Sequence, residues 1–191
     1  MAERSGVAWL QRLWRRTKDE SGAHPGTRAV LPVEQALALL EAQLCEGVVR
    51  PGGEPQSAAL AVRTELSGPA PRNVFGRPVQ EETATGAAEA TSVATGMALA
   101  GLRATAFVSG EELIAGHEAL GGCAERLTPL VLHASCAEAG HRQYHAVANS
   151  GAFQAFASSG QEALDLSLVA RWVTERALVP GLVCTDLDVV E

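Results

Sequence analysis

Two patterns of apolar residues alternate along the chain from residue 31 onward. Helical spacing is clearest in residues 31–47, where Leu37, Leu40 and Leu44 share one face, Pro32 suits a first helical turn and Gly47 follows the end. Short apolar runs bounded by Gly, Pro and Ser are typical of buried strands. The patterns predict helices at 31–47, 57–66, 83–99, 110–120 and 160–178, and strands at 47–50, 103–109, 129–135, 152–158 and 180–186.

The alternation of these elements predicts the fold class. Strands that are apolar along their whole length are typical of a parallel sheet with helices on both faces. We therefore expect an α/β domain with three layers and a doubly wound, mostly parallel sheet, spanning residues 29–191. In such sheets, ligands bind where loops leave the carboxyl ends of the strands.

Residues 1–28 differ from the rest of the chain and form a predicted basic arm with its linker. They hold six Lys/Arg and three acidic residues, a net charge of about +3, whereas the whole chain carries −7. Val7, Leu10, Leu13 and Trp14 fall at helical spacing with arginines on the other faces. This amphipathic segment could pack on its own acidic domain, dock a partner protein or help to form a homodimer; use at a membrane surface or as an address tag is a further alternative.

Composition excludes several classes of protein. The net charge of −7 argues against nucleic-acid binding, which needs a concentrated basic surface. No run of roughly 18 apolar residues predicts a membrane span, and no apolar signal core is visible at the N-terminus, so we expect a cytoplasmic protein. The four cysteines form no CxxC pair and are interpreted as reduced, mostly buried thiols. Aromatic residues make up only 4% of the chain, which favours close packing through Ala and Gly.

Candidate chemistry lies at the expected carboxyl ends of strands. The pairs there are Gly52-Gly53, Glu81-Glu82, Ser109-Gly110, Ser135-Cys136 and Ser158-Ser159, followed by Asp186, which we expect with Asp188 at a solvated end. Glu81 and Glu82 precede a predicted helix, whose dipole favours a carboxylate there. Alternatively, a desolvated carboxylate at this turn could hydrogen-bond a ring nitrogen of a heterocyclic ligand.

Other motifs are weaker or missing. The group His133, Cys136, His141 and His145 has metal-like spacing, but His133 lies inside an apolar run that is typical of a core histidine, and we expect no metal site. The sequence has neither of the usual Gly-rich phosphate loops and no GxSxG nucleophile elbow. A self-contained nucleotide or acyl-transfer enzyme is therefore not supported.

Five segments in order carry a family resemblance: "NVFGRPV", "GMALAGLRATAFVSGEEL", "ERLTPLVLHAS", "NSGAFQAFASSGQEALDLSLVA" and "VPGLVCTD". Together they resemble the N-terminal, thiamine diphosphate pyrimidine-binding domain of pyruvate:ferredoxin oxidoreductase and related 2-oxoacid:ferredoxin oxidoreductases, over residues 33 to 188. The resemblance implies the pyrimidine-domain fold and half of a cofactor site, because a different domain of the family binds the diphosphate and Mg²⁺. The residues expected near such a cofactor are Gly52, Gly53, Glu82, Gly86, Ser109 and Gly110.

Three functional positions that the resemblance assigns are lost. The activating glutamate of the family, which acts on the pyrimidine ring, corresponds to Ala87 or, in a second alignment, to Ala84. The loop with a substrate-facing threonine corresponds to residues 50–53, which have no hydroxyl, and an arginine after the third apolar strand corresponds to Ala137. Glu82, Glu89 and Arg142 are the candidates that could replace the missing catalytic groups.

These departures lead to two hypotheses about function. The first is a degenerate pyrimidine-domain protein, non-catalytic or auxiliary, that acts through protein association, with a protein partner or homodimer reached through the 1–28 arm and no cofactor bound by the chain alone. The second is an authentic subunit of a 2-oxoacid:ferredoxin oxidoreductase that binds thiamine diphosphate with Mg²⁺ only together with a partner domain.

Overall fold

The computed structural model describes residues 31–52, 72–136 and 141–186. In these ranges six strands form one sheet, with strand order β2-β1-β3-β4-β6-β5 and every neighbouring pair parallel. The elements in chain order are α2 (Val33–Leu44), β1 (Gly47–Pro51), β2 (Gln80–Ala84), α4 (Ala87–Leu99), β3 (Ala104–Ser109), the 3₁₀ turn η1 (Gly110–Glu112), α5 (His117–Glu125), β4 (Val131–Cys136), α6 (Arg142–Ala146), β5 (Phe153–Ala157), α7 (Gly160–Ala177) and β6 (Gly181–Asp186).

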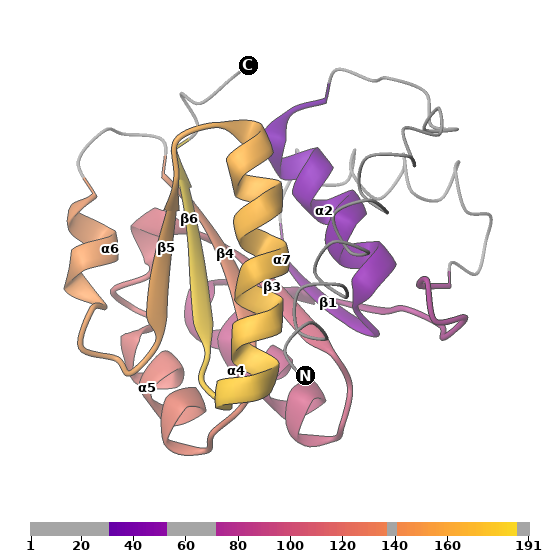
Figure 1. Ribbon diagram of the computed structural model, residues 1–191. Helices are drawn as coiled ribbons and strands as arrows, with labels where there is room; N and C mark the ends of the chain where they lie inside the picture. The colour runs from indigo at the N-terminus through magenta and orange to yellow at the C-terminus, as the bar shows by residue number, and fades with distance from the viewer. Residues whose placement is uncertain (1–30, 53–71, 137–140, 187–191) are drawn as a thin grey trace, which may run out of the picture. The chain divides into compact units, whose positions relative to one another are not determined.

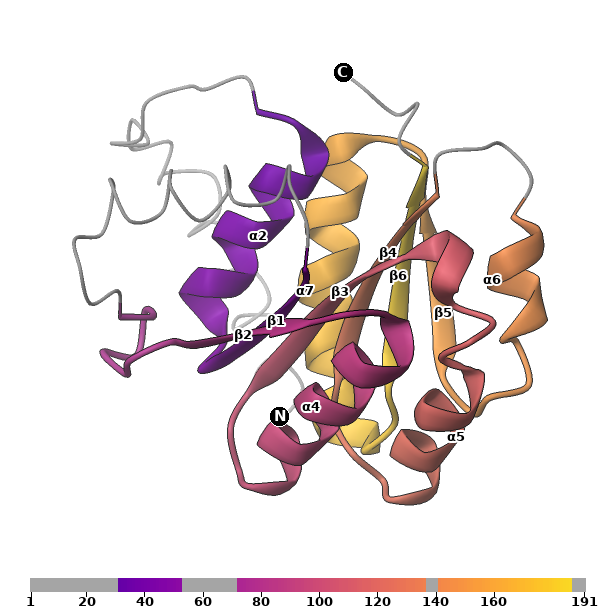
Figure 2. The same ribbon diagram turned by 180° about the vertical axis from the view of Figure 1, so that it is seen from behind.

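Helices cover both faces of the sheet, as Figures 1 and 2 show from opposite sides. Helices α2 and α7 lie on one face, and α4 and α5 lie on the other. The main core lies between the sheet and α4 and α5, and it is built largely from Ala, Val, Leu and Cys. The predicted α/β class with a parallel, doubly covered sheet is confirmed.

Small side chains let α4 lie close to the strands. Ala87, Ala90 and Ala94 are buried on its inner face, and the hydroxyl of Thr91 donates to the Ala87 carbonyl one turn earlier, at 2.7 Å. A local bond of this kind satisfies a polar group without bulk. Helix α4 therefore packs on the sheet through alanine side chains, as predicted.

The four cysteines are all buried and free, as expected. Burial raises the pKa of Cys123, Cys136 and Cys184 above the ordinary thiol value. A thiol that stays protonated is a poor nucleophile, so these residues act as small core side chains.

Two local predictions were wrong, and one helix was not foreseen. Glu81 and Glu82 do not begin a helix but lie in β2, which is an edge strand. Four of its five residues are exposed, so its sequence, QEETA, has no apolar pattern from which a strand could be predicted. The predicted helix 110–120 is the short turn η1 followed by α5, which begins at His117. Helix α6 was not predicted at all. The predicted helix 57–66 and the 1–28 arm lie outside the described residues.

Candidate functional site

Strands β2, β1 and β3 are neighbours, so their carboxyl ends meet at one part of the sheet. The chain winds outward in both directions from this part, which makes it the topological switch point where α/β folds bind ligands. Four of the residues expected near a cofactor gather here: Gly52 after β1, Gly86 at the start of α4, Ser109 at the end of β3, and Gly110 after it. Gly53 lies outside the described ranges.

Gly52 and Gly110 are held by close backbone packing. The Gly52 N–H donates to the Ala84 carbonyl at 2.6 Å, which ties the end of β1 to the end of β2. A Cβ atom on Gly110 would lie 2.0 Å from the Sγ atom of Cys136. No side chain fits there, so this glycine is required by contact with β4 and not by an unusual φ angle.

A carboxylate does lie at the start of α4, but it comes from a different loop. Ala87, the first residue of α4, is only 2% exposed, and its N–H donates to Oε2 of Glu112 at 3.2 Å. Glu112 belongs to η1, which follows β3. Sequence patterns did not identify Glu112, because the contact spans 25 positions and joins two loops.

The two predicted acidic candidates have different surroundings. Glu82 is exposed on edge strand β2, while its neighbour Glu81 forms an ion pair with Arg50 of β1. Glu89 lies in the first turn of α4, where its Oε2 accepts from the hydroxyl and the N–H of Thr85. These hydrogen bonds lower the pKa of Glu89, which keeps it ionised and suits it to capping the helix rather than donating a proton.

Arg142 is remote from these acids along the sheet. It is exposed and begins α6, the helix that leads from β4 to the edge strand β5. Glu82 lies on β2 at the other edge, so the structure does not bring the two together. Ala137, the position matched to the family arginine, lies outside the described residues.

The histidine and cysteine group is dispersed among different environments. His133 is buried, as predicted for a core histidine, whereas His141 is exposed and its Nε2 lies 2.8 Å from Oδ2 of Asp186. The side chain of Asp186 is 27% exposed, so this strand end is partly solvated, and Asp188 lies outside the described residues. Within residues 31–52, 72–136 and 141–186, no three His, Cys, Asp or Glu side chains are grouped to hold a metal ion.

His133 belongs to a buried ionic cluster on the opposite face of the sheet. The carboxylate of Glu41 on α2 accepts from Arg171 of α7 at 2.7 Å, from His133 at 2.9 Å and from Cys45 at 3.0 Å. Ser167 donates to the same carboxylate. Burial opposes ionisation of Glu41, but Arg171 and these hydrogen bonds outweigh it and hold its pKa well below the ordinary value.

The described part of the carboxyl edge is rich in carboxylates. These are Glu34 at the start of α2, which accepts from Ser135, and, near the strand ends and the helix starts that follow them, Glu89, Glu111, Glu112, Glu162 and Asp186. Arg50 at this edge is already paired with Glu81, and Arg142 lies toward the β5 side. The described side chains at this edge therefore repel an anionic group such as a diphosphate and favour neutral or cationic groups.

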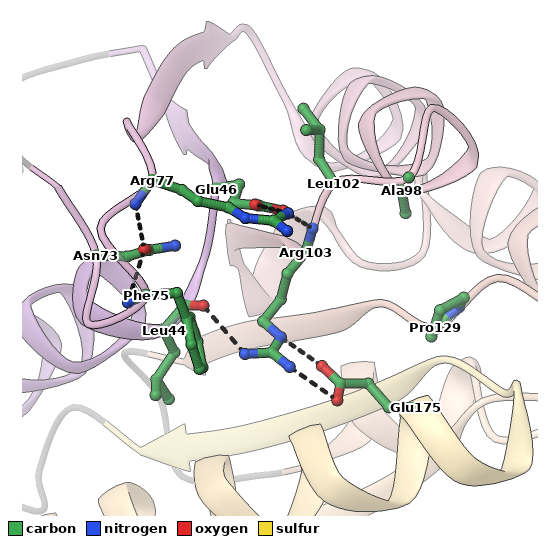
Figure 3. A pocket seen from close by; sticks show the side chains of 11 residues that line it. Leu44, Glu46, Asn73, Phe75, Arg77, Ala98, Leu102, Arg103, Pro129 and Glu175 are labelled. Atoms are coloured by element: carbon green, nitrogen blue, oxygen red, sulfur yellow. Dashed lines mark hydrogen bonds and ion pairs between the residues drawn. The ribbon is translucent and has the colours of Figure 1, made fainter.

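The NVFG segment forms a tight turn beside a pocket at the amino ends of the strands. The pocket has a volume of about 420 Å³, and Figure 3 shows the side chains that line it. Asn73 is buried and organises the turn: its Oδ1 accepts from the N–H groups of Phe75 and Arg77, each at 3.0 Å, and its Nδ2 donates to the Cys45 carbonyl at 3.2 Å. Gly76 has φ +74°, which favours glycine.

Comparison with known proteins supports the fold and leaves the sequence family open. No protein-family model and no curated protein matches the chain in sequence. Among solved structures, the chain is similar to a 2-oxoglutarate:ferredoxin oxidoreductase from Magnetococcus marinus with 2-oxoglutarate, coenzyme A and succinyl-CoA bound, with a TM-score of 0.68 and 14% identity.

That match covers 96% of this chain and 35% of the other. This chain therefore spans about a third of the length of the enzyme that it resembles. This chain and the enzyme share a fold, which is the fold implied by the motifs from NVFG to VCTD.

Within the described ranges, no helix is long and apolar enough to cross a membrane.

Proposed function

We propose that this chain is a pyrimidine-binding-domain-like protein, related to 2-oxoacid:ferredoxin oxidoreductases, with a non-catalytic or auxiliary role in the cytoplasm that it performs through association with another protein. The shared fold supports the family relation. The coverage of only 35% of the similar enzyme favours action together with other chains. Under this proposal, the resemblance to a thiamine diphosphate domain reflects an ancestral cofactor site and does not imply a present activity.

The observation that carries the proposal is the start of α4. In the two alignments of the motifs, the family's activating carboxylate belongs at Ala87 or at Ala84, and in this chain each of these positions holds a buried methyl group. The N–H of Ala87 is already bonded to Glu112. A methyl group cannot exchange a proton with a pyrimidine ring, and a displaced catalytic group commonly costs orders of magnitude in rate.

The electrostatics of the carboxyl edge agree with this proposal. Thiamine diphosphate, when bound, supplies a carbanion for attack on a 2-oxoacid. Its diphosphate needs cations, whereas the described edge carries mainly carboxylates. The chain's own residues therefore fit at most the uncharged ring end, and a partner domain would have to hold the diphosphate and Mg²⁺.

The alternative, an authentic enzyme subunit, is favoured by one specific contact. Glu112 contacts Ala87, one of the two positions matched to the family's carboxylate, so it is a stronger substitute for the lost carboxylate than Glu82 or Glu89. In this alternative Glu112 would contact the ring nitrogen, and Gly52, Gly86, Ser109 and Gly110 would form the surrounding wall, with the partner completing the site.

Binding of thiamine diphosphate tests the two hypotheses. The melting temperature of the full chain is measured with thiamine diphosphate and Mg²⁺, alone and with any co-purified partner, for the native sequence, Glu112→Gln, Glu82→Ala and the control Glu118→Gln, an exposed residue on α5. We expect no stabilisation in any sample. Stabilisation that Glu112→Gln abolishes and Glu118→Gln retains would overturn the auxiliary role and support the enzyme subunit.

The basic arm is tested separately. If residues 1–28 dock a partner, deleting them should release that partner in a co-purification experiment while the melting temperature of the remaining domain stays the same. A retained partner would place the docking surface elsewhere on the chain.

A further inference from the structure

Helix α7 carries apolar side chains on the side that points away from the sheet. Its inner residues, among them Ala163 and Ala170, are buried, and the helix packs on β4, β5 and β6 (Figure 1). On the outer side, however, Leu168 is 46% exposed, Val169 is 54% exposed and Trp172 is 60% exposed. Large apolar side chains that gather on an open surface are typical of a contact with another protein.

The tryptophan on this surface is held in position. The guanidinium of Arg176, one helical turn later, lies over the Trp172 ring, 4.4 Å from its centroid. The helix itself is fixed from below by the buried ion pair between Arg171 and Glu41. A side chain held in this way loses little entropy on binding, and tryptophan and arginine are enriched at the centres of protein interfaces.

Charged residues of opposite sign stand at the two ends of the apolar surface. Asp165 is exposed one turn before Val169, and Arg176 is exposed one turn after Trp172. In the part of the chain that the structure describes, the ion pairs are formed by other residues, and Asp165 accepts only an amide hydrogen bond, from Gln161 at 3.0 Å. Both charges are therefore available to a partner.

The spacing of these four residues is self-complementary. Asp165, Val169, Trp172 and Arg176 fall at positions i, i+4, i+7 and i+11, which line one stripe of a helix and which we call the outer stripe of α7. A two-fold axis midway along the stripe sets Asp165 of each copy opposite Arg176 of the other, and Val169 opposite Trp172. Parallel pairing would set acid against acid, so the charges select the antiparallel arrangement.

We propose that the outer stripe of α7 pairs with the same stripe of a second copy of this chain in an antiparallel, two-fold dimer. The inference rests on the proposed role in protein association and adds the surface and the partner. Helix α7 lies on the opposite face of the sheet from α4, whose start contacts Glu112. The dimer therefore leaves the candidate site accessible.

Exchange of charges across the two-fold axis tests this interface by sedimentation equilibrium of the full chain. The native protein should show a monomer–dimer equilibrium. Asp165→Arg sets arginine against arginine, and Arg176→Asp sets aspartate against aspartate, so each variant alone should dimerise at least about tenfold more weakly. An equimolar mixture of the two variants should associate more strongly than either alone, because opposite charges then face each other at both ends of the stripe.

Trp172→Ala tests the apolar part of the stripe. The dissociation constant should weaken at least about 30-fold, the change that corresponds to a hot spot of roughly 2 kcal/mol. Leu99→Ala is the matched control, because Leu99 is 58% exposed and ends α4 on the other side of the sheet. Its dissociation constant should be that of the native protein, and thermal unfolding of every variant reports whether the domain folds.

Three outcomes would overturn the proposal. These are a native chain that is monomeric at every concentration, a dimer that Trp172→Ala leaves unchanged, and a mixture of the charge variants that associates no more strongly than its components. None of them alters the thiamine diphosphate measurement, so failure of this interface and failure of the auxiliary role are distinguishable.

Discussion

Replacing Arg171 by leucine should destabilise the domain severely. Its side chain is 6% exposed, and it pairs with Glu41, whose side chain has no exposed surface. The guanidinium also donates to the Ala104 carbonyl at 2.8 Å. Removing one partner of a buried ion pair leaves the other charge desolvated and costs roughly 3–5 kcal/mol. Domains of this size have unfolding free energies of roughly 5–15 kcal/mol, so the loss is a large share of the total.

Urea denaturation measures this loss. With a slope of about 2 kcal/mol per molar urea, the midpoint should fall by roughly 1.5–2.5 M. Arg103→Leu is the control, because Arg103 also forms an ion pair with a glutamate, Glu175, but the side chains of this pair are 30% and 36% exposed. An exposed pair contributes roughly 0–1 kcal/mol, so its midpoint should fall by no more than about 0.5 M. Equal shifts in the two variants would refute the assignment of the buried cluster as a major source of stability.

The double variant Glu41→Leu/Arg171→Leu separates pair energy from desolvation. Replacing both charges by apolar side chains removes the penalty of an unpaired buried charge, so the double variant should be more stable than either single variant. Simple addition of the two single losses would contradict this reasoning.

The pH dependence of stability gives an independent check on Glu41. Its pKa in the folded protein is lowered from 4.5, so the stability it contributes is present above that value and is lost as the pH falls below it. In Arg171→Leu, burial is no longer opposed by the guanidinium, so the folded-state pKa of Glu41 rises toward or above its unfolded value, and acidification then removes less stability or even restores some. Urea midpoints measured from pH 8 down to pH 3 should therefore fall less in the variant than in the native chain.

Four further substitutions, one of them a control, test other parts of the structure. Gly110→Ala should lower stability by roughly 1–3 kcal/mol in urea denaturation, because its Cβ would collide with the Sγ atom of Cys136, whereas Gly96→Ala, where a Cβ meets nothing within 4 Å, should raise stability by up to about 1 kcal/mol. Asn73→Ala should cost roughly 2–3 kcal/mol by thermal unfolding, since two N–H groups and the Cys45 carbonyl lose their partner; a loss below about 0.5 kcal/mol would show that water replaces it. The lowered pKa of Glu89 means that its ionised carboxylate stabilises the fold above its unfolded pKa and that this stability is lost on acidification. Glu89→Gln should remove this part of the acid-induced loss of stability. An unchanged pH profile would count against Glu89 as a helix cap.

The elements with strong apolar patterns were predictable, and those with polar or short sequences were not. Residues 31–47 and 160–178 gave α2 and α7 because their apolar residues repeat at helical spacing. Strand β2 was not predicted, because its exposed edge-strand residues show no apolar pattern. Helix α6 was not predicted, because five residues are too few to show a helical period. The apolar pattern of a sequence therefore indicates which residues are buried, and it predicts a helix or strand only where the buried residues recur at a regular spacing.

The candidate site was predictable in its location and not in its charged residues. Gly52, Ser109 and Gly110 follow from the rule that parallel strands end at a common edge. Glu112 reaches α4 across 25 positions, and Glu41 meets Arg171 across 130, so neither contact has a local signature. Glu82 was placed at a helix start because adjacent acids resemble a helix entrance, whereas the sheet register sets Glu81 beside Val48 and Glu82 beside Val49.

The Glu41–Arg171 contact also constrains how the chain folds. It joins the first described helix, α2, to the last, α7, and both must be in place before either charge is satisfied. Contacts of such long sequence separation slow folding, because most of the chain must be ordered before they form. A chain still emerging from the ribosome would hold α2 with an unsatisfied carboxylate until residue 171 has been synthesised. We therefore expect this layer of the domain to assemble only after synthesis is nearly complete, and truncations that end before α7 to leave α2 undocked.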